Sequence, residues 1–175
     1  WINEIHYYKF TYEGIEVVIE DLDANNYDLS KFLVQLYDGK NGTLYQPQLT
    51  VSQFNHNHGI YAGNMSVYSH RFPESQKGKS AGIALGYIDG ADTTLLDFIS
   101  YEGIFTASEG IAAGAISTNI GVVESDRSGS TSLQLVGTYP NFSWSANLDT
   151  TWGAPNDGGD QSLPVELSSF SAKYK

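Results

Sequence analysis

Hydrophobic and polar residues alternate along this chain in short stretches that turn signals separate. The stretch IEVVIE, for example, places Ile15, Val17 and Ile19 on one face and Glu16 and Glu20 on the other. A period of two is typical of half-buried β-strands, and no long segment shows the period of an amphipathic helix. The stretches with this alternation are 1–8, 15–20, 32–37, 81–88, 95–101 and 132–136.

Weaker patterns predict further strands, and polar clusters predict turns. The weaker strands are 44–45, 49–54, 60–68 and 121–124, with polar turns at 55–59 and 125–130. Asp-Gly and Asn-Gly pairs at 38–39, 41–42 and 89–90 are hairpin signals. Many short strands separated by such turns indicate an antiparallel β-sandwich. We expect one domain over residues 1–160, followed by a tail.

The alternation also selects a core and one unusual segment. After the strand at 95–101, glycines at 103, 110 and 114 interrupt a run of small residues. An interior glycine costs a helix about 1 kcal/mol relative to alanine, so we predict an ordered loop packed closely on other backbone. At the end of that strand we expect Tyr101 to be buried. The predicted core residues are Ile5, Val17, Ile19, Val34, Leu36, Ile83, Leu85, Phe98, Leu133 and Leu135.

Composition narrows the functions that such a fold could serve. The chain has 175 residues, no cysteine, and twenty acidic against nine basic residues, for a net charge of −11. Without cysteine, disulfides, thiolate catalysis and cysteine zinc sites are excluded. The negative charge disfavours unassisted binding to nucleic acids or anionic lipids. No run approaches the ~18 apolar residues of a membrane span. Twelve Tyr and eighteen Gly are typical of an all-β extracellular protein.

An ordered set of motifs resembles the lamin-tail domain in its bacterial secreted form. The resemblance implies an immunoglobulin-like β-sandwich and a non-catalytic module, of a kind often found beside secreted hydrolases. The chain departs from the family pattern at Lys31-Phe32 and over residues 55–80. The motifs are INEIHY (2–7), YDLS (27–30), LVQLYDGKNG (33–42), AGIALGYIDG (81–90), DFISYEGIFTA (97–107), IGVVES (120–125), SLQLVGT (132–138), Trp144 and WGAPNDGGDQ (152–161).

The composition changes near Gly158, and the stretch LPVELSSFSA at 163–172 resembles a second known sequence. It is similar to the linker that precedes the C-terminal sorting domain of proteins exported by type IX secretion. We therefore expect residues 161–175 to be a linker toward a sorting domain. The resemblance implies a secreted or surface-bound protein of a Gram-negative bacterium.

An acidic loop offers a candidate calcium site. Oxygen ligands at alternate positions suit hard cations, and Asp21, Asp23, Asn25 and Asp28 have such spacing. An EF-hand loop is excluded, because its twelfth position is Phe32 rather than Glu. The alternative is a solvated loop whose side chains make local turns.

Histidines and carboxylates give weaker candidates. His56 and His58 could share a face and hold zinc or copper, although the sequence offers no third ligand. Carboxylates in or beside strands could pair as in a glycosidase. The alternative is that they face solvent or guard sheet edges. The carboxylates concerned are Glu4, Glu16, Glu20 and Asp97.

Aromatic residues are the leading candidates for ligand binding. Sugar rings stack on exposed Tyr and Trp, so we predict a carbohydrate platform from Tyr7, Tyr8, Tyr61, Tyr68 and Trp152. The alternative is that these rings, like Trp144, belong to the core or cover an end of the sandwich.

A basic patch of Arg71, Lys77 and Lys79 is the expected place for an anionic group. These features predict a monomeric accessory module that binds a polysaccharide or packs on an adjacent hydrolase domain. A carboxylate-dependent hydrolase, acting on glycosides or phosphoesters, and a structural spacer stay open as alternatives.

Overall fold

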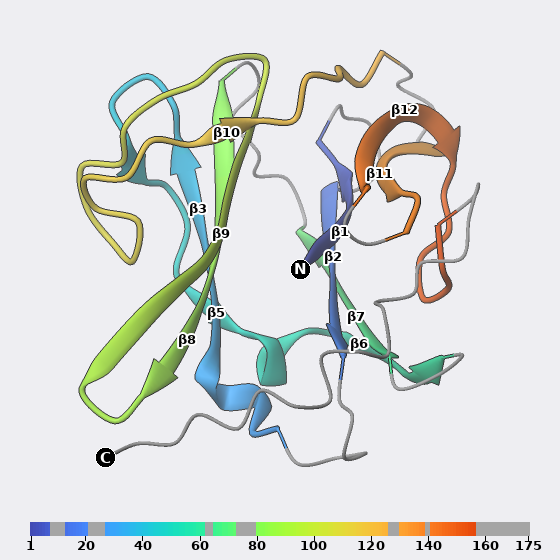
Figure 1. Cartoon of the computed structure of the whole chain (residues 1–175), viewed down its shortest axis with the longest axis horizontal. Helices are drawn as coiled ribbons and strands as arrows, with labels where there is room; N and C mark the ends of the chain where they lie inside the picture. The colour runs from blue at the N-terminus through green and yellow to red at the C-terminus, as the bar shows by residue number, and fades with distance from the viewer. Residues whose placement is uncertain are drawn as a thin grey trace.

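The computed structural model describes residues 1–7, 13–20, 27–61, 65–72, 80–125, 130–138 and 141–156, with the backbone alone for 57–61. Two sheets face each other across a hydrophobic core (Figure 1), which confirms the predicted all-β sandwich. The first sheet has the strand order β12-β11-β1-β2-β7-β6 and the second β10-β9-β8-β3-β4, with β5 also on β3. All named pairs are antiparallel except β9 with β10.

The strands of the first sheet are β1 (Ile2–His6), β2 (Glu13–Glu20), β6 (His56–Tyr61), β7 (Met65–Phe72), β11 (Thr131–Val136) and β12 (Ser143–Asp149). Those of the second are β3 (Phe32–Asp38), β4 (Thr43–Leu44), β5 (Leu49–Thr50), β8 (Ala81–Asp89), β9 (Asp92–Tyr101) and β10 (Thr118–Asn119). Two 3₁₀ helices are η1 (Leu29–Lys31) and η2 (Val51–Gln53). Within the described residues, no helix is long and apolar enough to cross a membrane.

The main core lies between the sheets and contains most of the predicted positions. All of the predicted core residues except Phe98 and Leu135 belong to this cluster. Phe98 is buried in a second cluster, and Leu135 is only half-buried. Since a β-strand alternates its two faces, the second cluster belongs to the opposite face of the second sheet.

A β-bulge in β1 breaks the strict alternation predicted there. Ile2 pairs with Val17 and Glu4 with Glu16, so Asn3 is one extra residue between them. The bulge allows Ile2 and Ile5 to face the same core although they are three residues apart. The bulge also places the side chains of Asn3 and Glu4 on the outer face of the first sheet, where the candidate site lies.

Several weak strand predictions are wrong. The turn at 55–59 and the single strand at 60–68 are replaced by two paired strands, β6 and β7. The stretch at 49–54 is a strand only at 49–50, in β5, and continues as the helix η2, while 121–124 forms no strand. The alternation did not reveal β12, the edge strand beside β11. Edge elements depend on their neighbours for pairing, so their own residue pattern is a poor guide.

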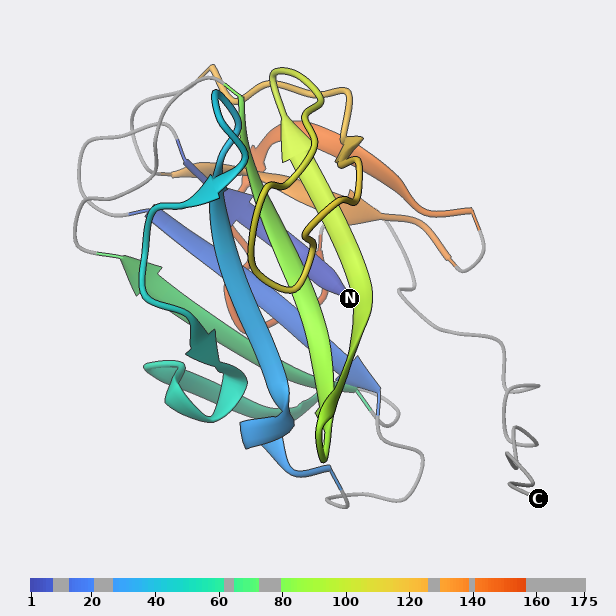
Figure 2. The same cartoon turned by 90° about the vertical axis from the view of Figure 1, so that its left-hand side faces the viewer.

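The glycine loop, residues 102–117, covers the outer face of the second sheet (Figure 2). Its Phe105, Ala107 and Ala112 pack with Tyr37, Ala84 and Phe98 beneath them. Gly110 has a φ of +74°, and a Cβ there would collide with Gln35 Oε1 and the Tyr37 hydroxyl. The prediction of an ordered loop packed closely on its neighbours is therefore confirmed, as is the burial of Tyr101.

Candidate functional site

The outer face of the first sheet carries buried carboxylates beneath a covering segment. Glu4 and Glu16 are paired residues on neighbouring strands, and both are 0% exposed. The cover is the strap, defined here as residues 150–156, which follows β12. Its Trp152 ring packs on Gly14, where an added Cβ would lie 3.1 Å from the ring. Gly14 thus gives the strap room to approach the sheet.

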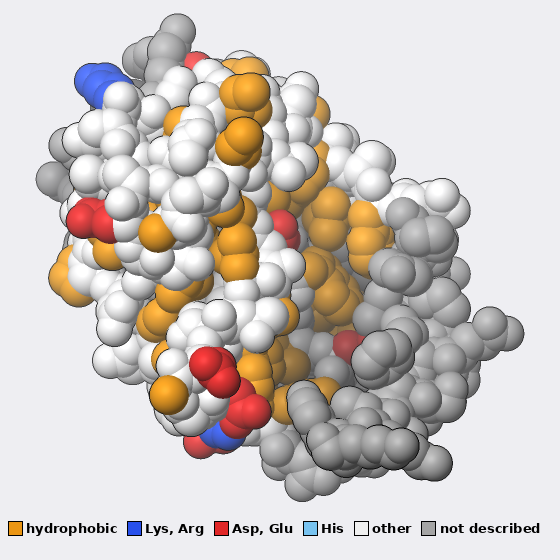
Figure 3. Space-filling model, turned by 60° about the vertical axis from the view of Figure 1, so that its left-hand side comes forward, with side chains coloured by type: hydrophobic (Ala, Val, Ile, Leu, Met, Phe, Trp, Pro, Cys, Tyr) orange, Lys and Arg blue, Asp and Glu red, His pale blue; other side chains and the backbone are white. Residues whose placement is uncertain are grey.

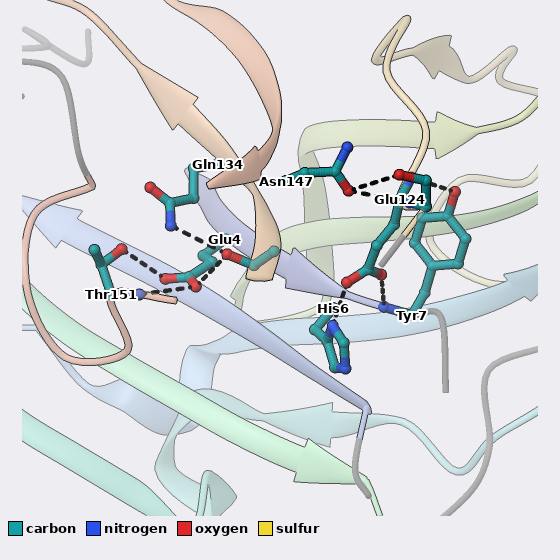
Figure 4. A network of polar contacts seen from close by, with 9 residues as sticks. Glu4, His6, Tyr7, Glu124, Gln134, Asn147 and Thr151 are labelled. Carbon is teal, nitrogen blue, oxygen red and sulfur yellow. Dashed lines mark hydrogen bonds and ion pairs between the residues drawn. The ribbon is translucent and has the colours of Figure 1, made fainter. Parts of the chain in front are cut away.

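Glu4 is bonded from the sheet and from the strap. The Ser132 hydroxyl donates to Glu4 Oε1 at 2.6 Å, and Gln134 Nε2 donates to the same hydroxyl at 3.1 Å. The Thr151 amide lies 3.1 Å from Glu4 Oε1, and the Thr151 hydroxyl lies 3.0 Å from Glu4 Oε2. Figure 4 shows these contacts converging on the carboxylate from opposite sides. The carboxylate therefore links the sheet to the strap.

Glu16 makes a second link to the strap. The Gly153 amide donates to Glu16 Oε2 at 2.7 Å, and Asn3 Nδ2 donates to Glu16 Oε1 at 2.9 Å. Asn156 completes the network by donating from Nδ2 to the carbonyls of Asn3 and Leu135, each at 2.8 Å. The far end of the strap is thus fixed to the bulge in β1 and to β11.

A second polar network lies at the C-terminal end of β1 and contains His6, Tyr7 and Glu124 (Figure 4). His6 Nδ1 forms a buried ion pair with Glu124 Oε1, and the Tyr7 amide donates to Glu124 Oε2 at 2.7 Å. The Glu124 amide donates to the Tyr7 hydroxyl at 3.1 Å, and that hydroxyl donates to Glu102 Oε1 at 3.0 Å. The Glu124 carboxylate and backbone amide are thus both bonded to His6 and Tyr7, at the end of β1.

Burial favours the neutral form of both strap carboxyls. It raises the pKa of Glu4 to about 7, and the bonds from Ser132 and Thr151 only partly oppose this. Burial raises the pKa of Glu16 to about 8, and the nearby charge of Glu4 adds to the effect. Because the charge of one carboxylate disfavours ionisation of the other, the two carboxyls titrate as a coupled pair.

The predicted carboxylates do not meet as a group. Glu4 and Glu16 are brought together, but both are buried, so the expectation that they face solvent is wrong. Glu20 is half-buried at the end of β2. Asp97 lies on β9. Burial raises the pKa of Asp97, and the positive charge of the Trp1 amino group opposes this rise only in part. The sequence did not indicate Glu124, Thr151 or Asn156, which only the fold brings to this face.

The predicted aromatic platform is corrected. Tyr7 is 2% exposed and stacks on Tyr101, with ring centroids 3.9 Å apart, and Tyr68 is 9% exposed. Neither ring has a free face for a sugar. Trp152 is half-buried as part of the strap. Tyr8 and the side chain of Tyr61 lie outside the described residues.

The basic and metal candidates are only partly described. Arg71 is exposed on β7, and its backbone amide donates to Asn55 Oδ1 at 3.1 Å. Asp28 caps η1 by accepting the Ser30 amide at 3.0 Å, and the Ser30 hydroxyl lowers the pKa of Asp28. Within the described ranges, no group of three or more His, Asp or Glu could hold a metal. Outside those ranges lie Lys77, Lys79, Asp21, Asp23, Asn25 and the side chain of His58.

One end of the sandwich presents an aromatic group that the sequence pattern did not indicate. Tyr27 is 47% exposed, more than any other described Phe, Tyr or Trp, and its ring meets Phe32 at 5.8 Å. Phe32 meets Tyr87 at 5.1 Å, and Lys31 Nζ lies 5.7 Å from the Tyr87 ring. Lys31 Nζ is also 3.6 Å from Asp89. These residues (Tyr27, Lys31, Phe32, Tyr87 and Asp89) form the end cluster.

The end cluster lies where η1 approaches the β8–β9 turn (Figure 2). At the lower end of the face in Figure 3, acidic and basic side chains adjoin hydrophobic ones. A ring with an exposed face beside charged hydrogen-bonding groups can hold a sugar by stacking and by bonds to its hydroxyls. The end cluster therefore combines an exposed aromatic ring with a charged donor and a charged acceptor.

Comparisons of the chain with protein-family models, curated proteins and solved structures found no match in any of the three. The resemblance to lamin-tail domains and the type IX linker stay predictions that rest on the motifs of the sequence.

Proposed function

We propose that this chain is a non-catalytic binding module of a secreted or cell-surface bacterial protein, and that it binds a neutral carbohydrate. A partner hydrolase domain is the alternative ligand. The type IX linker motif supports a location outside the cell, and the lamin-tail motifs support an accessory role beside an enzyme.

The burial of the carboxylates is the observation that carries the non-catalytic assignment. Glu4 and Glu16 are 0% exposed and Glu124 is 2% exposed, and both oxygens of each carboxylate contact protein groups. A general acid or base must come within hydrogen-bond reach of its substrate. These three carboxylates instead hold the strap and the segment beside β1 in place.

The end cluster supports a carbohydrate as the ligand. Tyr27 offers an exposed ring, while Lys31 and Asp89 offer a donor and an acceptor on a contiguous surface. The net charge of −11 opposes polyanions, so a retained glycan should be neutral or bridged by calcium.

Affinity gels cast with neutral and acidic polysaccharides, with and without calcium, test this proposal. We expect a neutral polysaccharide to retain the protein, and Tyr27→Ala to weaken retention at least about tenfold, or ~1.4 kcal/mol. Leu96→Ala is the matched control, because Leu96 is exposed to a similar degree, 50%, but lies on β9 outside the end cluster. It should leave retention unchanged.

Three results would contradict the proposal. Turnover of ester, phosphate or glycosidic substrates by the isolated domain, without glycan binding, would assign it to the hydrolases. Tight calcium-independent retention on a sulfated polymer would contradict the charge argument and favour the patch at Arg71, Lys77 and Lys79. If the domain shows neither glycan binding nor turnover, a structural spacer is the surviving function.

A further inference from the structure

We propose that Glu4 carries a proton in the folded protein and that loss of this proton, together with that of Glu16, releases the strap from the first sheet. The strap would then be a pH-sensitive cover, closed in mildly acidic solution and open in alkaline solution. This inference is independent of the carbohydrate proposal, because it concerns a different face of the molecule.

A count of hydrogens places the proton on Glu4. The Thr151 hydroxyl lies 3.0 Å from Glu4 Oε2 and 3.0 Å from Asn156 Oδ1. A threonine hydroxyl has one hydrogen, so it can donate to only one of these two acceptors. If Glu4 Oε2 is protonated, it donates to the Thr151 oxygen, and Thr151 donates to Asn156. Both contacts are then hydrogen bonds.

The other oxygen of Glu4 is consistent with this arrangement. Glu4 Oε1 accepts from the Ser132 hydroxyl and the Thr151 amide, which are both donors to it. An unprotonated oxygen on one side and a protonated oxygen on the other is the pattern of a neutral carboxylic acid. With Glu4 charged, the Thr151 hydroxyl would have one hydrogen for two buried acceptors, of which Asn156 Oδ1 also accepts from Asn3 Nδ2 at 3.3 Å.

Ionisation of Glu16 adds to the effect of ionising Glu4, so both carboxyls contribute to release of the strap. The two carboxyls belong to directly paired residues, whose Cβ atoms lie about 4.5–5.5 Å apart in an antiparallel pair. Negative charges on two such neighbouring side chains repel each other beneath a cover that excludes water, and the charge of Glu4 raises the pKa of Glu16. Opening the strap admits water to both groups, so ionisation favours the open form.

Other charged groups lie near this face. His6 on β1 is ion-paired to Glu124, and its charge lowers the pKa of Glu4 less than burial raises it. The register places Arg71 of β7 opposite Gly14, while Asp149 ends β12 and its carbonyl accepts from Gln134. The Trp1 amino group donates to the Val18 carbonyl. None of these groups appears in a described hydrogen bond with the Glu4 or Glu16 carboxylate.

Amide hydrogen exchange of the whole chain tests the release directly. Thr151 and Gly153 donate to the two carboxylates, so their protection reports strap closure. We compare protection factors, corrected for the intrinsic rate, at about pH 5 and about pH 9, on either side of the two raised pKa values. Each pKa unit is tenfold in the opening equilibrium, so the rise at Glu4 alone should lower protection about a hundredfold, and ionisation of Glu16 should lower it further. The Gly114 amide in the glycine loop, bonded to the Ala107 carbonyl, should keep its protection.

Variants separate this proposal from general loosening at high pH. Glu4→Gln combined with Glu16→Gln keeps the shape and cannot ionise, so strap protection should become equal at the two pH values. Glu109→Gln is the matched control, since Glu109 also accepts a backbone amide, that of Leu44, but is exposed. It should retain the full pH dependence. If the double variant does not fold, the wild-type comparison of strap and loop amides still decides. Equal strap protection at both pH values in the wild-type protein would overturn the proposal.

Discussion

The two outer faces of this sandwich are both covered, but by different physical means. On the second sheet, the glycine loop packs apolar side chains over Tyr37, Ala84 and Phe98 and brings backbone very close to the sheet. On the first sheet, the strap is held by hydrogen bonds to the buried carboxyls of Glu4 and Glu16. The first kind of cover depends on shape and the second on protonation. The same fold can thus hold one cover at all pH values and make the other respond to pH.

The largest expected effect concerns the apolar cover. Phe98 is 6% exposed, and its ring lies 5.3 Å from Tyr37 and 5.4 Å from Phe105. Phe98→Ala should lower the free energy of unfolding by about 3–5 kcal/mol, because it leaves a cavity beneath the glycine loop. Denaturant unfolding measures this. Leu96→Ala, two residues away and exposed, should cost within about 0.5 kcal/mol. Equal effects of the two substitutions would show that the loop does not bury this face.

A second, smaller effect tests the close approach of the loop backbone. Gly110→Ala places a Cβ against Gln35 and Tyr37, and we expect it to cost about 1–3 kcal/mol through overpacking, beyond the strain of its positive φ. Gly114→Ala is the matched control, because φ is +80° and nothing lies within 4 Å of the added Cβ. Thermal melts of the pair isolate the packing contribution. Identical melts would indicate that the loop moves aside freely.

The polar cover should make stability depend on pH. The pKa values of Glu4 and Glu16 are raised in the folded state, so this state binds more protons than the unfolded chain between about pH 4.5 and 8. Their contribution is fully present below the ordinary glutamate pKa and is lost as pH rises through the folded values. The melting temperature should therefore fall by several degrees from about pH 5 to about pH 9. A Glu4→Gln, Glu16→Gln double variant should show a flatter profile. A wild-type melting temperature that rises over this range would contradict the assignment.

Calcium is expected to have the smallest effect. A divalent ion at Asp21, Asp23, Asn25 and Asp28 would offset part of the net charge of −11 and stabilise the protein by mass action. Melts in millimolar calcium and in chelator, at equal ionic strength, measure it. We expect a small rise in melting temperature with calcium and the same rise in the Glu4→Gln, Glu16→Gln double variant, because these substitutions leave all four predicted ligands unchanged. Identical melts with calcium and chelator would leave Asp28 as the cap of η1 alone.

The sequence pattern predicted the glycine loop better than the strap. The loop could be anticipated because its glycines are local signals of close packing and positive φ. The bulge at Asn3 could not, because period-two alternation places Ile2 and Ile5 on opposite faces until the partner strand is known. The strap could not either, since Thr151 and Asn156 lie about 150 residues from Glu4 and Asn3 along the chain. Glu4 and Glu16 could be named as candidate carboxylates, but their burial depends on this distant cover.

Direct titration of the two carboxyls tests the central claim that protonated glutamates close the first sheet. Side-chain ¹³C carboxyl shifts of Glu4 and Glu16, followed by NMR in the intact protein, report their protonation without a substitution. The account predicts a coupled titration with midpoints near the folded pKa values of about 7 and about 8. Midpoints at the ordinary glutamate value, about 4.3, for both carboxyls would contradict it.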